Sequence, residues 1–450
     1  MNSIAAASLP VIPNRINVLT SIRRRILITF IVLGAICIYL SYAWVTFDMP
    51  GLIQTAKPER AVLLANDAVA YKVHVTKSVR TGVVKVAIEG ERTATYTTPP
   101  EWVTIDKQQT EVTLGDGYSV KILDKALELQ VPNYGNITVT IANNQINTTL
   151  PEGKSPPEWL RVSNVKFDAR PDLGKRVQMS RAKIEIHRYF TGWENFFFPF
   201  NSELTAYSFT EIISLMMNKE RLELEKPNWR LVFDTFWNNP DWQHGNVFKA
   251  LLETLLMAVL GTVVAAFVAL PLAFLAAKNF SPSKALLFFV RRTFDLLRGI
   301  DMLIWSLIFI RSFGLGPLTG TLAIAFTETG ELGKLFSEAL ENTDKKQVDG
   351  VQSTGASKSQ TYRFGVIPQI LPIFLSQGLY YLESNIRSAT VIGALGAGGI
   401  GLMLVETIRT SRDWENTLYL ILLTLFLVIT MDKISAWFRR RMIHGKTSQD

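Results

Sequence analysis

The chain has 450 residues, of which 48% are hydrophobic and only 19% charged. A sequence this apolar excludes a disordered protein and a fully soluble enzyme, so we expect part of it to span a membrane and part to be globular. Lys and Arg outnumber Asp and Glu by 47 to 39, and the excess lies in short blocks beside apolar runs, as the positive-inside rule predicts for cytoplasmic ends. A nucleic-acid surface would instead interleave basic and polar residues on a folded face.

Cysteine and histidine are too sparse in this sequence for the common metal or redox sites. Cys37 is the one cysteine of the sequence, and it lies inside an apolar run. The histidines are far apart in the sequence, at His74, His187, His244 and His444. We therefore expect no disulfide, no zinc site and no thiol chemistry.

Residues 1–25 are basic and are predicted to lie in the cytoplasm, and residues 26–47 form an uncharged run that is long enough for a first membrane helix. A cleaved signal peptide is the alternative. Its apolar part is usually shorter and ends at small residues, whereas this run ends with Tyr42, Trp44 and Phe47. The chain should therefore leave the cytoplasm here.

Residues 48–190 are predicted to form a β-rich extracytoplasmic domain. From about residue 61 to residue 186, apolar residues recur at period two, as in Val84, Val86 and Ile88, and turn-type residues separate the runs. Several short, half-buried strands in succession are typical of a small sandwich or barrel. This part of the sequence offers no catalytic cluster.

Residues 191–246 are predicted to form an aromatic and amphipathic connector, also outside the cytoplasm. Its dense aromatic residues suit the interface between lipid and water, and packing beneath the soluble domain is the alternative. An amphipathic helix is expected around residues 208–219.

Residues 247–436 are predicted to form a transmembrane domain with five further spans. The candidate spans are residues 254–277, 300–313, 318–340, 364–382 and 416–431. Basic residues near both ends, including the tail at 437–450, should keep both ends in the cytoplasm, so the number of crossings must be even. Six crossings use every apolar run.

A polar segment at residues 341–363 separates the fourth and fifth spans. Gly355 permits a sharp turn and Pro368 suits the start of a helix, so we expect two short helices bent at the glycine. Such an elbow can dock into a partner protein, and a solvated connector is the alternative.

The segment 341–368 resembles the coupling loop of ABC-importer permeases, in which E-A-A is followed after three residues by Gly and later by I-x-L-P. The corresponding positions are Asp349, Gly350, Val351, Gly355, Ala356, Ile367 and Pro368. The glycine and the closing proline match strictly, whereas Asp349 stands in place of Glu.

A wider stretch, from about residue 190 to residue 442, resembles one branch of that family, the permeases of phosphonate and related phosphorus-oxyanion importers. The similar segments include residues 251–255, 269–277, 313–318, 362–369 and 385–393, which occur in the same order and spacing. The resemblance implies a mostly α membrane protein with the six transmembrane helices of the type I (MetI-like) importer fold. The β-rich domain lies outside the family's usual pattern.

The resemblance further implies a permease subunit, and no enzyme, that moves a phosphonate, phosphite or phosphate across the bacterial inner membrane by alternating access. A cytoplasmic ABC ATPase dimer would bind the elbow, an extracytoplasmic substrate-binding protein would deliver the solute, and a second permease, identical or paralogous, would complete the pathway. Because the sequence has no G-x-x-x-x-G-K-[S/T] motif, ATP and Mg would bind the ATPase and this chain would need no cofactor. A permease for another small solute and a membrane-anchored sensor remain the alternatives.

Residues 396–401 match G-x-G-x-x-G, but they lie in an apolar segment and not between a soluble strand and a helix. We expect the glycines here to bend a membrane helix or to let helices pack closely. They are Gly393, Gly396, Gly398, Gly399 and Gly401.

Charged and polar residues within the predicted spans are the remaining candidates, because an ionisable group at mid-membrane costs at least roughly 2–3 kcal/mol and is usually paired. They are Arg311, Glu328, Glu331, Glu383, Asn385, Arg387 and Ser388. Glu383 and Arg387 are four residues apart and share a helix face, and Arg311 is placed to form a second network with the two glutamates of the neighbouring span. Either arginine offers positive potential to a passing oxyanion, or both only neutralise buried glutamates.

Overall fold

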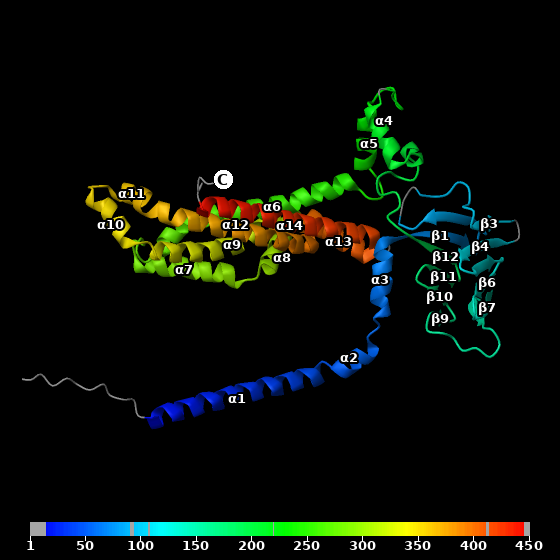
Figure 1. The fold of residues 1–450 in the computed structure, drawn as a ribbon, viewed down its shortest axis with the longest axis horizontal. Coiled ribbons are helices and arrows are strands. Elements are labelled where there is room, and N and C mark those ends of the chain that lie inside the picture. Colours follow the sequence, from blue (N-terminus) through cyan, green and yellow to red (C-terminus); the bar gives the residue numbers. More distant parts are fainter. Residues whose placement is uncertain (1–14, 91–93, 107–108, 219, 411–413, 445–450) are drawn as a thin grey trace, which may run out of the picture. The chain divides into compact units, whose positions relative to one another are not determined.

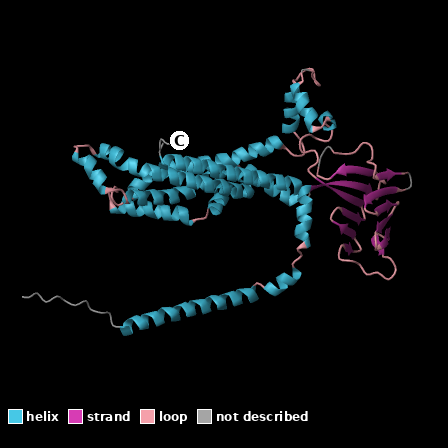
Figure 2. Cartoon of the chain, in the orientation of Figure 1, coloured by secondary structure: helices cyan, strands magenta, loops and turns pink. Residues whose placement is uncertain are grey.

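The computed structural model describes residues 15–90, 94–106, 109–218, 220–410 and 414–444. It divides into two compact units, residues 1–63 and residues 64–450. Helices and strands are segregated along the chain, and all strands of the described residues lie between residues 70 and 191 (Figures 1 and 2).

The first unit contains α1 (Arg15–Thr46) and α2 (Met49–Thr55). Residues Arg23–Thr46 of α1 are long and apolar enough to cross a membrane, which agrees with the span expected at residues 26–47. Asp48 adopts a left-handed backbone conformation after α1, and its carboxylate accepts a hydrogen bond from Gly51 at the start of α2.

Helix α3 (Glu59–Val69) precedes the strands, so the prediction that strands begin near residue 61 is wrong by nine residues. Residues 61–69 contain Ala and Leu, which favour helices, and Glu59 lies in the first turn, where the helix dipole stabilises a negative charge. The local helix preference outweighs the short apolar pattern here.

The described residues of the β-rich domain form two antiparallel six-stranded sheets. The first sheet contains, in spatial order, β2 (Val84–Ile88), β1 (Ala70–Ser78), β12 (Lys183–Thr191), β11 (Lys175–Ser180), β10 (Lys166–Asp172) and β9 (Leu160–Val162). The second contains β3 (Val103–Ile105), β4 (Thr110–Gly115), β5 (Tyr118–Ile122), β6 (Ala126–Val131), β7 (Gly135–Ala142) and β8 (Gln145–Thr149). These strands agree with the predicted β-rich domain, and its place outside the cytoplasm stays a prediction.

A single apolar core joins the two sheets of this domain. Val75 and Ile186 from the first sheet and Leu127 from the second are fully buried in it. The first and last strands of the domain, β1 and β12, pair along their whole length from Ala70↔Thr191 to Ser78↔Lys183. The chain therefore enters and leaves the domain side by side, as expected of a domain inserted between two helices.

The connector contains α4 (Phe209–Met217) and α5 (Asn228–Trp237), which pack on each other. Ser208 and Glu211 form a capping box at the start of α4, so the predicted amphipathic helix is present. Trp193, Phe196 and Trp242 cluster with Tyr419 of the helical domain.

The helical domain follows the connector (Figure 1). Its helices are α6 (His244–Ala276), α7 (Lys284–Gly299), α8 (Met302–Phe313), α9 (Pro317–Glu341), α10 (Lys345–Ser353), α11 (Lys358–Thr361), α12 (Ile367–Ile392), α13 (Gly399–Thr410) and α14 (Trp414–His444). Small residues let α6 approach its neighbours: a Cβ atom on Gly261 would lie 2.6 Å from the Cγ2 atom of Ile324 in α9.

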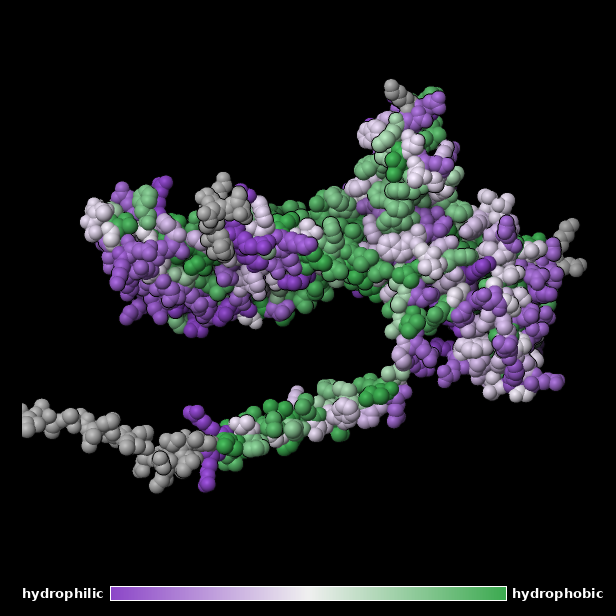
Figure 3. Space-filling model, viewed as in Figure 1, coloured by the Kyte–Doolittle hydropathy of each residue, from purple (hydrophilic) through white to green (hydrophobic). Residues whose placement is uncertain are grey.

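Among the described residues of the whole chain, three helices are long and apolar enough to cross a membrane, or four if the bent pair α12–α13 is one span. These helices match four of the six predicted spans. Helix α8 has only 12 residues, and α9 carries Glu328, Glu331 and Lys334, so the count of six stays a prediction. Apolar surface covers the middle of the helical domain and polar surface covers the end that carries α10 (Figure 3).

Candidate functional site

The segment between α9 and α12 forms an exposed elbow. Helix α10 ends at Ser353, Gly355 follows with a φ angle of +84°, and α11 begins at Lys358. This left-handed conformation strongly favours glycine, since a Cβ atom makes it costly for other residues. Ser357 and Gln360 form a capping box at the start of α11. The elbow therefore has the first short helix and the glycine turn that the sequence predicts. The second helix is not separate, because it continues through a π-helical turn at Tyr362–Val366 into α12.

The candidate coupling residues lie on α10, in the glycine turn and at the start of α12. Asp349, Gly350, Gly355, Ile367 and Pro368 are exposed, whereas Val351 and Ala356 are half-buried. The exposed positions leave the outer surface of the elbow free to contact another protein.

The elbow is tied to the membrane helices by hydrogen bonds and by packing. The Gln369 side chain of α12 accepts a hydrogen bond from the backbone N–H of Asp344 at 2.9 Å and donates one to the carbonyl of Gly365 at 2.6 Å. Val366 is fully buried in a core that includes Phe336 of α9. A displacement of the elbow must therefore move the ends of α9 and α12.

Glu341, at the end of α9, joins three elements next to the elbow. Its carboxylate accepts a hydrogen bond from the backbone N–H of Lys278 at 2.7 Å and pairs with Arg291 of α7, and its carbonyl accepts one from the side chain of Asn279. The sequence analysis did not identify this residue as a junction, because its partners lie 50 residues or more away.

The glycine-rich stretch after α12 bends the chain by 59° before α13 begins. Gly396, Gly398 and Gly399 have φ angles of +118°, +90° and +68°, in the region that glycine favours. A Cβ atom on Gly393 would lie 2.4 Å from the carbonyl oxygen of Gly398, and one on Gly401 would lie 1.9 Å from that of Thr390. The backbone therefore folds back on itself at these positions.

Two side chains of α6 hold the start of α13. Glu253 accepts a hydrogen bond from the N–H of Gly399 at 3.1 Å, and the Thr254 hydroxyl accepts one from the N–H of Ile400 at 3.0 Å. Both donors belong to the first turn of α13, where N–H groups lack partners within the helix. Sequence reasoning missed this contact, although residues 251–255 are among the segments that carry the family resemblance.

Glu383 on α12 is held by two arginines. Arg439 of α14 lies 3.3 Å from its carboxylate and Arg387 lies 3.8 Å from it, so the predicted pair is present but is not the closer one. The Arg387 side chain is 55% exposed in the single chain. Ser388, the next residue, is half-buried. Because Glu383 is shared between two arginines, Arg387 keeps N–H donors that can bind another group.

The predicted network of Arg311 with Glu328 and Glu331 is not formed: within the described residues no ion pair joins this arginine to either glutamate. Arg311 lies on an exposed face at the end of α8, whereas Glu328 is only 4% exposed inside the bundle. Near Glu328, the Asn385 amide donates a hydrogen bond to the Thr262 hydroxyl at 2.9 Å. A polar contact thus links α6 and α12 inside the helical domain.

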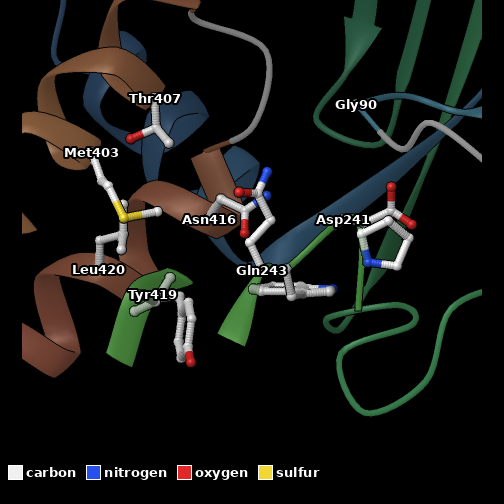
Figure 4. Close-up of a pocket in the computed structure, with 11 residues that line it drawn as sticks. Gly90, Asp241, Gln243, Met403, Thr407, Asn416, Tyr419 and Leu420 are labelled. Atoms are coloured by element: carbon white, nitrogen blue, oxygen red, sulfur yellow. The ribbon is translucent and has the colours of Figure 1, made fainter. Parts of the chain in front are cut away.

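A cavity of about 160 Å³ lies between the segment before α6 and helices α13 and α14. Figure 4 shows Asp241 and Gln243 on one side of it, and Thr407, Asn416 and Tyr419 on the helices. Its described lining includes a carboxylate and no Lys or Arg side chain. These residues alone do not offer the positive charge that an oxyanion would need.

An ionic cluster covers the outer face of the first sheet. Glu89 lies 3.2 Å from Nδ1 of His187. Burial raises the pKa of Glu89, but the hydrogen bond and charge of His187, together with Lys72 and His74, outweigh it and lower this pKa to about 2. On β10, burial likewise raises the pKa of Asp168, but its bidentate contact with Arg176 lowers it below its usual range.

Comparison with known proteins places the helical domain in a family. The model for "binding-protein-dependent transport system inner membrane component" matches residues 269–444. The putative phosphite transport system permease protein HtxC of Stutzerimonas stutzeri is 36% identical over 200 residues, which are 44% of this chain and 71% of that protein. The chain belongs to this family of inner membrane transport components.

Two further relatives are permeases by name. The phosphate-import permease protein PhnE of Mycolicibacterium smegmatis is 36% identical over 197 residues, 44% of this chain but only 37% of that protein. The phosphite transport system permease protein PtxC of Stutzerimonas stutzeri is 34% identical over 192 residues, 43% of this chain and 70% of that protein. A structure of the MetNI methionine ABC transporter aligns with 44% of this chain and 96% of its own chain, at 17% identity and a TM-score of 0.40.

The family match begins inside α6 and ends at the end of α14. It includes the elbow, the glycine bend and the Glu383 pair. It does not include the β-rich domain or the connector. The candidate site of this permease is therefore built from elements inside the family match, and the other two regions lie outside it.

Proposed function

We propose that this permease is the membrane subunit of an ATP-driven ABC importer that carries a phosphite, phosphonate or phosphate ion across the bacterial inner membrane. The observation that carries the proposal is its 34–36% identity, over 192 to 200 residues, to permeases named for phosphite or phosphate. We assign that domain the type I (MetI-like) fold with six spans.

In this proposal the elbow is the contact with the motor. A cytoplasmic ATPase dimer binds the exposed surface around Asp349, Gly350 and Gly355, and ATP and Mg are held by that dimer. Both chain termini are then cytoplasmic, and the β-rich domain is outside. Two observations support this role: Gln369 is hydrogen-bonded to the elbow, and Val366 is buried in the core next to it. Because of these contacts, a displacement of the elbow also displaces α9 and α12.

A second permease, either an identical copy or a paralogue, completes the pathway, and an extracytoplasmic binding protein delivers the ion. Arg387 lies at this pathway and offers positive potential to the passing oxyanion. Its exposure and its sharing of Glu383 with Arg439 support this assignment. ATP binding favours the outward-open state and hydrolysis the inward-open state, so the permease works by a shift of populations.

The proposed function is tested by purifying the complex with its co-expressed ATPase and binding protein and reconstituting it in liposomes. ATP-dependent uptake of phosphite, methylphosphonate and phosphate is measured, with sulfate as the comparison anion. Uptake of at least one phosphorus oxyanion but not sulfate is expected. Uptake of sulfate with equal efficiency, or uptake without any ATPase subunit, would contradict the proposal.

The role of Arg387 is tested in the same liposomes with Arg387→Gln. We expect uptake to be lost while the complex assembles normally. The matched control is Arg292→Gln, because Arg292 is an exposed arginine of α7 whose contacts, an ion pair with Asp295 and the ring of Phe288, lie within its own helix. Wild-type uptake by the Arg387→Gln complex would remove this residue from the pathway.

A further inference from the structure

Helix α4 carries an apolar stripe on its exposed side. The stripe consists of Phe209, Ile213, Met216 and Met217, all exposed. Spacings of four, seven and eight residues place these side chains on one face of a helix. Phe209 is 68% exposed and Met217 is 82% exposed, so the largest apolar side chains of this helix point away from the protein.

Helix α5 repeats this pattern. Trp229 and Phe233 are exposed and form the stripe of this helix. Phe236 and Trp237 continue the same spacing but are half-buried against the start of α6. The adjoining faces of the two helices already form a small core from Ile212, Leu215 and Val232. The packing of α4 against α5 therefore does not use the exposed stripes. Apolar surface is visible over this hairpin in Figure 3.

Aromatic contacts join α4 and α5 to each other and to the membrane helix α6. The ring of Phe197 lies 6.4 Å from that of Phe209 and 6.3 Å from that of Phe236. Trp237 lies 5.4 Å from Phe248, an exposed residue in the second turn of α6. The apolar surface of the hairpin therefore continues directly onto the exposed face of a membrane-spanning helix.

The position of Phe248 along α6 sets the depth of this contact. The uncharged run begins at Thr254 and has 24 residues up to Ala277, which is about 36 Å of helix at roughly 1.5 Å per residue and enough for a hydrocarbon core of about 30 Å. Phe248 precedes this run by about 9 Å. It thus lies in the headgroup region, where aromatic side chains are enriched.

We propose that the hairpin of α4 and α5 lies on the outer surface of the lipid bilayer, with both apolar stripes inserted into the boundary between headgroups and acyl chains. Amphipathic helices of this kind insert to a depth of about 5–10 Å. Acidic residues outnumber basic ones by five to four between residues 208 and 237, so apolar burial and not attraction to anionic lipid holds the hairpin. The inference goes beyond transport: it assigns a lipid contact to a region outside the family match.

The lipid contact is tested in the full chain by placing single cysteines on the two sides of α4. Cys37 is first replaced by Ser. The test positions are Ile213→Cys and Met217→Cys, and the matched control is Ser214→Cys, an exposed residue 100° around the helix from Ile213. Each cysteine is labelled with an environment-sensitive fluorophore in phosphatidylcholine nanodiscs, and quenching is measured with brominated lipid and with aqueous iodide.

We expect brominated lipid to quench the fluorophores at residues 213 and 217 several-fold more strongly than the one at residue 214. Iodide should give the reverse order. Both orders should be unchanged when a third of the lipid is phosphatidylglycerol. Equal iodide quenching at all three positions would show a water-exposed face and overturn the proposal. Protection from both quenchers at residues 213 and 217 would show a protein partner, such as a second copy, and would overturn it as well. Unfolding midpoints matching the parent chain establish that the labelled variants are folded.

Discussion

Replacing Gly401 by Ala tests whether the bend between α12 and α13 depends on close backbone contact. A Cβ atom on Gly401 would lie 1.9 Å from the carbonyl oxygen of Thr390 and 2.8 Å from the backbone nitrogen of Ala394. Both neighbours are main-chain atoms. Relief of the overlap therefore requires the bent segments to separate, because no side chain can rotate away.

The size of the effect follows from two opposing terms. Alanine is normally better than glycine inside a helix by about 1 kcal/mol, whereas overpacking a well-packed interior costs about 1–3 kcal/mol and sometimes more. The separation of 1.9 Å at Gly401 is far below the roughly 3.5 Å at which such atoms normally touch. We therefore expect the Gly401→Ala chain to lose about 2 kcal/mol of unfolding free energy.

Gly378→Ala provides the matched control, because Gly378 lies inside α12 and, apart from the nearby backbone of its own helix, none of the described atoms is within 4 Å of its added Cβ atom. This variant should gain up to about 1 kcal/mol. Both chains are compared with the parent by SDS-induced unfolding in mixed micelles, followed by tryptophan fluorescence. If Gly401→Ala were as stable as Gly378→Ala, the close-contact reasoning would be refuted.

Three further substitutions probe the β-rich domain, the α6–α13 contact and the elbow. Glu89 has a pKa lowered from 4.5 to about 2, so its charge stabilises the fold above pH 4.5, and this stabilisation is lost as the pH falls through about 2. Glu89→Gln should therefore lower the thermal midpoint of unfolding at pH 7, and the difference from the parent chain should shrink as the pH falls. Thr254→Val leaves the buried N–H of Ile400 without its acceptor, which should cost about 1–3 kcal/mol in SDS unfolding, and no loss would contradict the contact. Gly355→Ala places a Cβ atom at a φ angle of +84°, costing about 1–2 kcal/mol; we expect weaker binding of the co-purified ATPase, and unchanged binding would count against a rigid elbow.

The β-rich domain could be predicted from the sequence because its signals are local. Alternating apolar residues mark the strands, and Asn143 and Asn144 adopt positive φ angles in the turn that joins β7 to β8. Each signal depends on residues that are neighbours in the chain. The pairing of β1 with β12 depends on residues more than a hundred positions apart, and no local pattern specifies it.

The elbow and the glycine bend were also predictable, since Gly355 and the glycines from 393 to 401 restrict the backbone where they stand. The ion-pair partners of the charged side chains could not be predicted in the same way. Glu383 was expected to pair with Arg387 four residues away, yet Arg439 of α14 lies closer. Which faces of two helices meet depends on the rotation of each helix about its axis, and this is set by packing along their whole length.

The connector and the membrane helices meet at His244, the first residue of α6. The Nε2 atom lies 2.7 Å from the carbonyl oxygen of Phe196 in the connector, and Nδ1 lies 2.8 Å from the hydroxyl of Tyr419 in α14. A carbonyl only accepts, so Nε2 carries the hydrogen and donates it to Phe196. Phe236 of α5 stacks on the same ring at 4.0 Å. A movement of α6 against α14 during transport must therefore carry the connector with it or break one of these two hydrogen bonds.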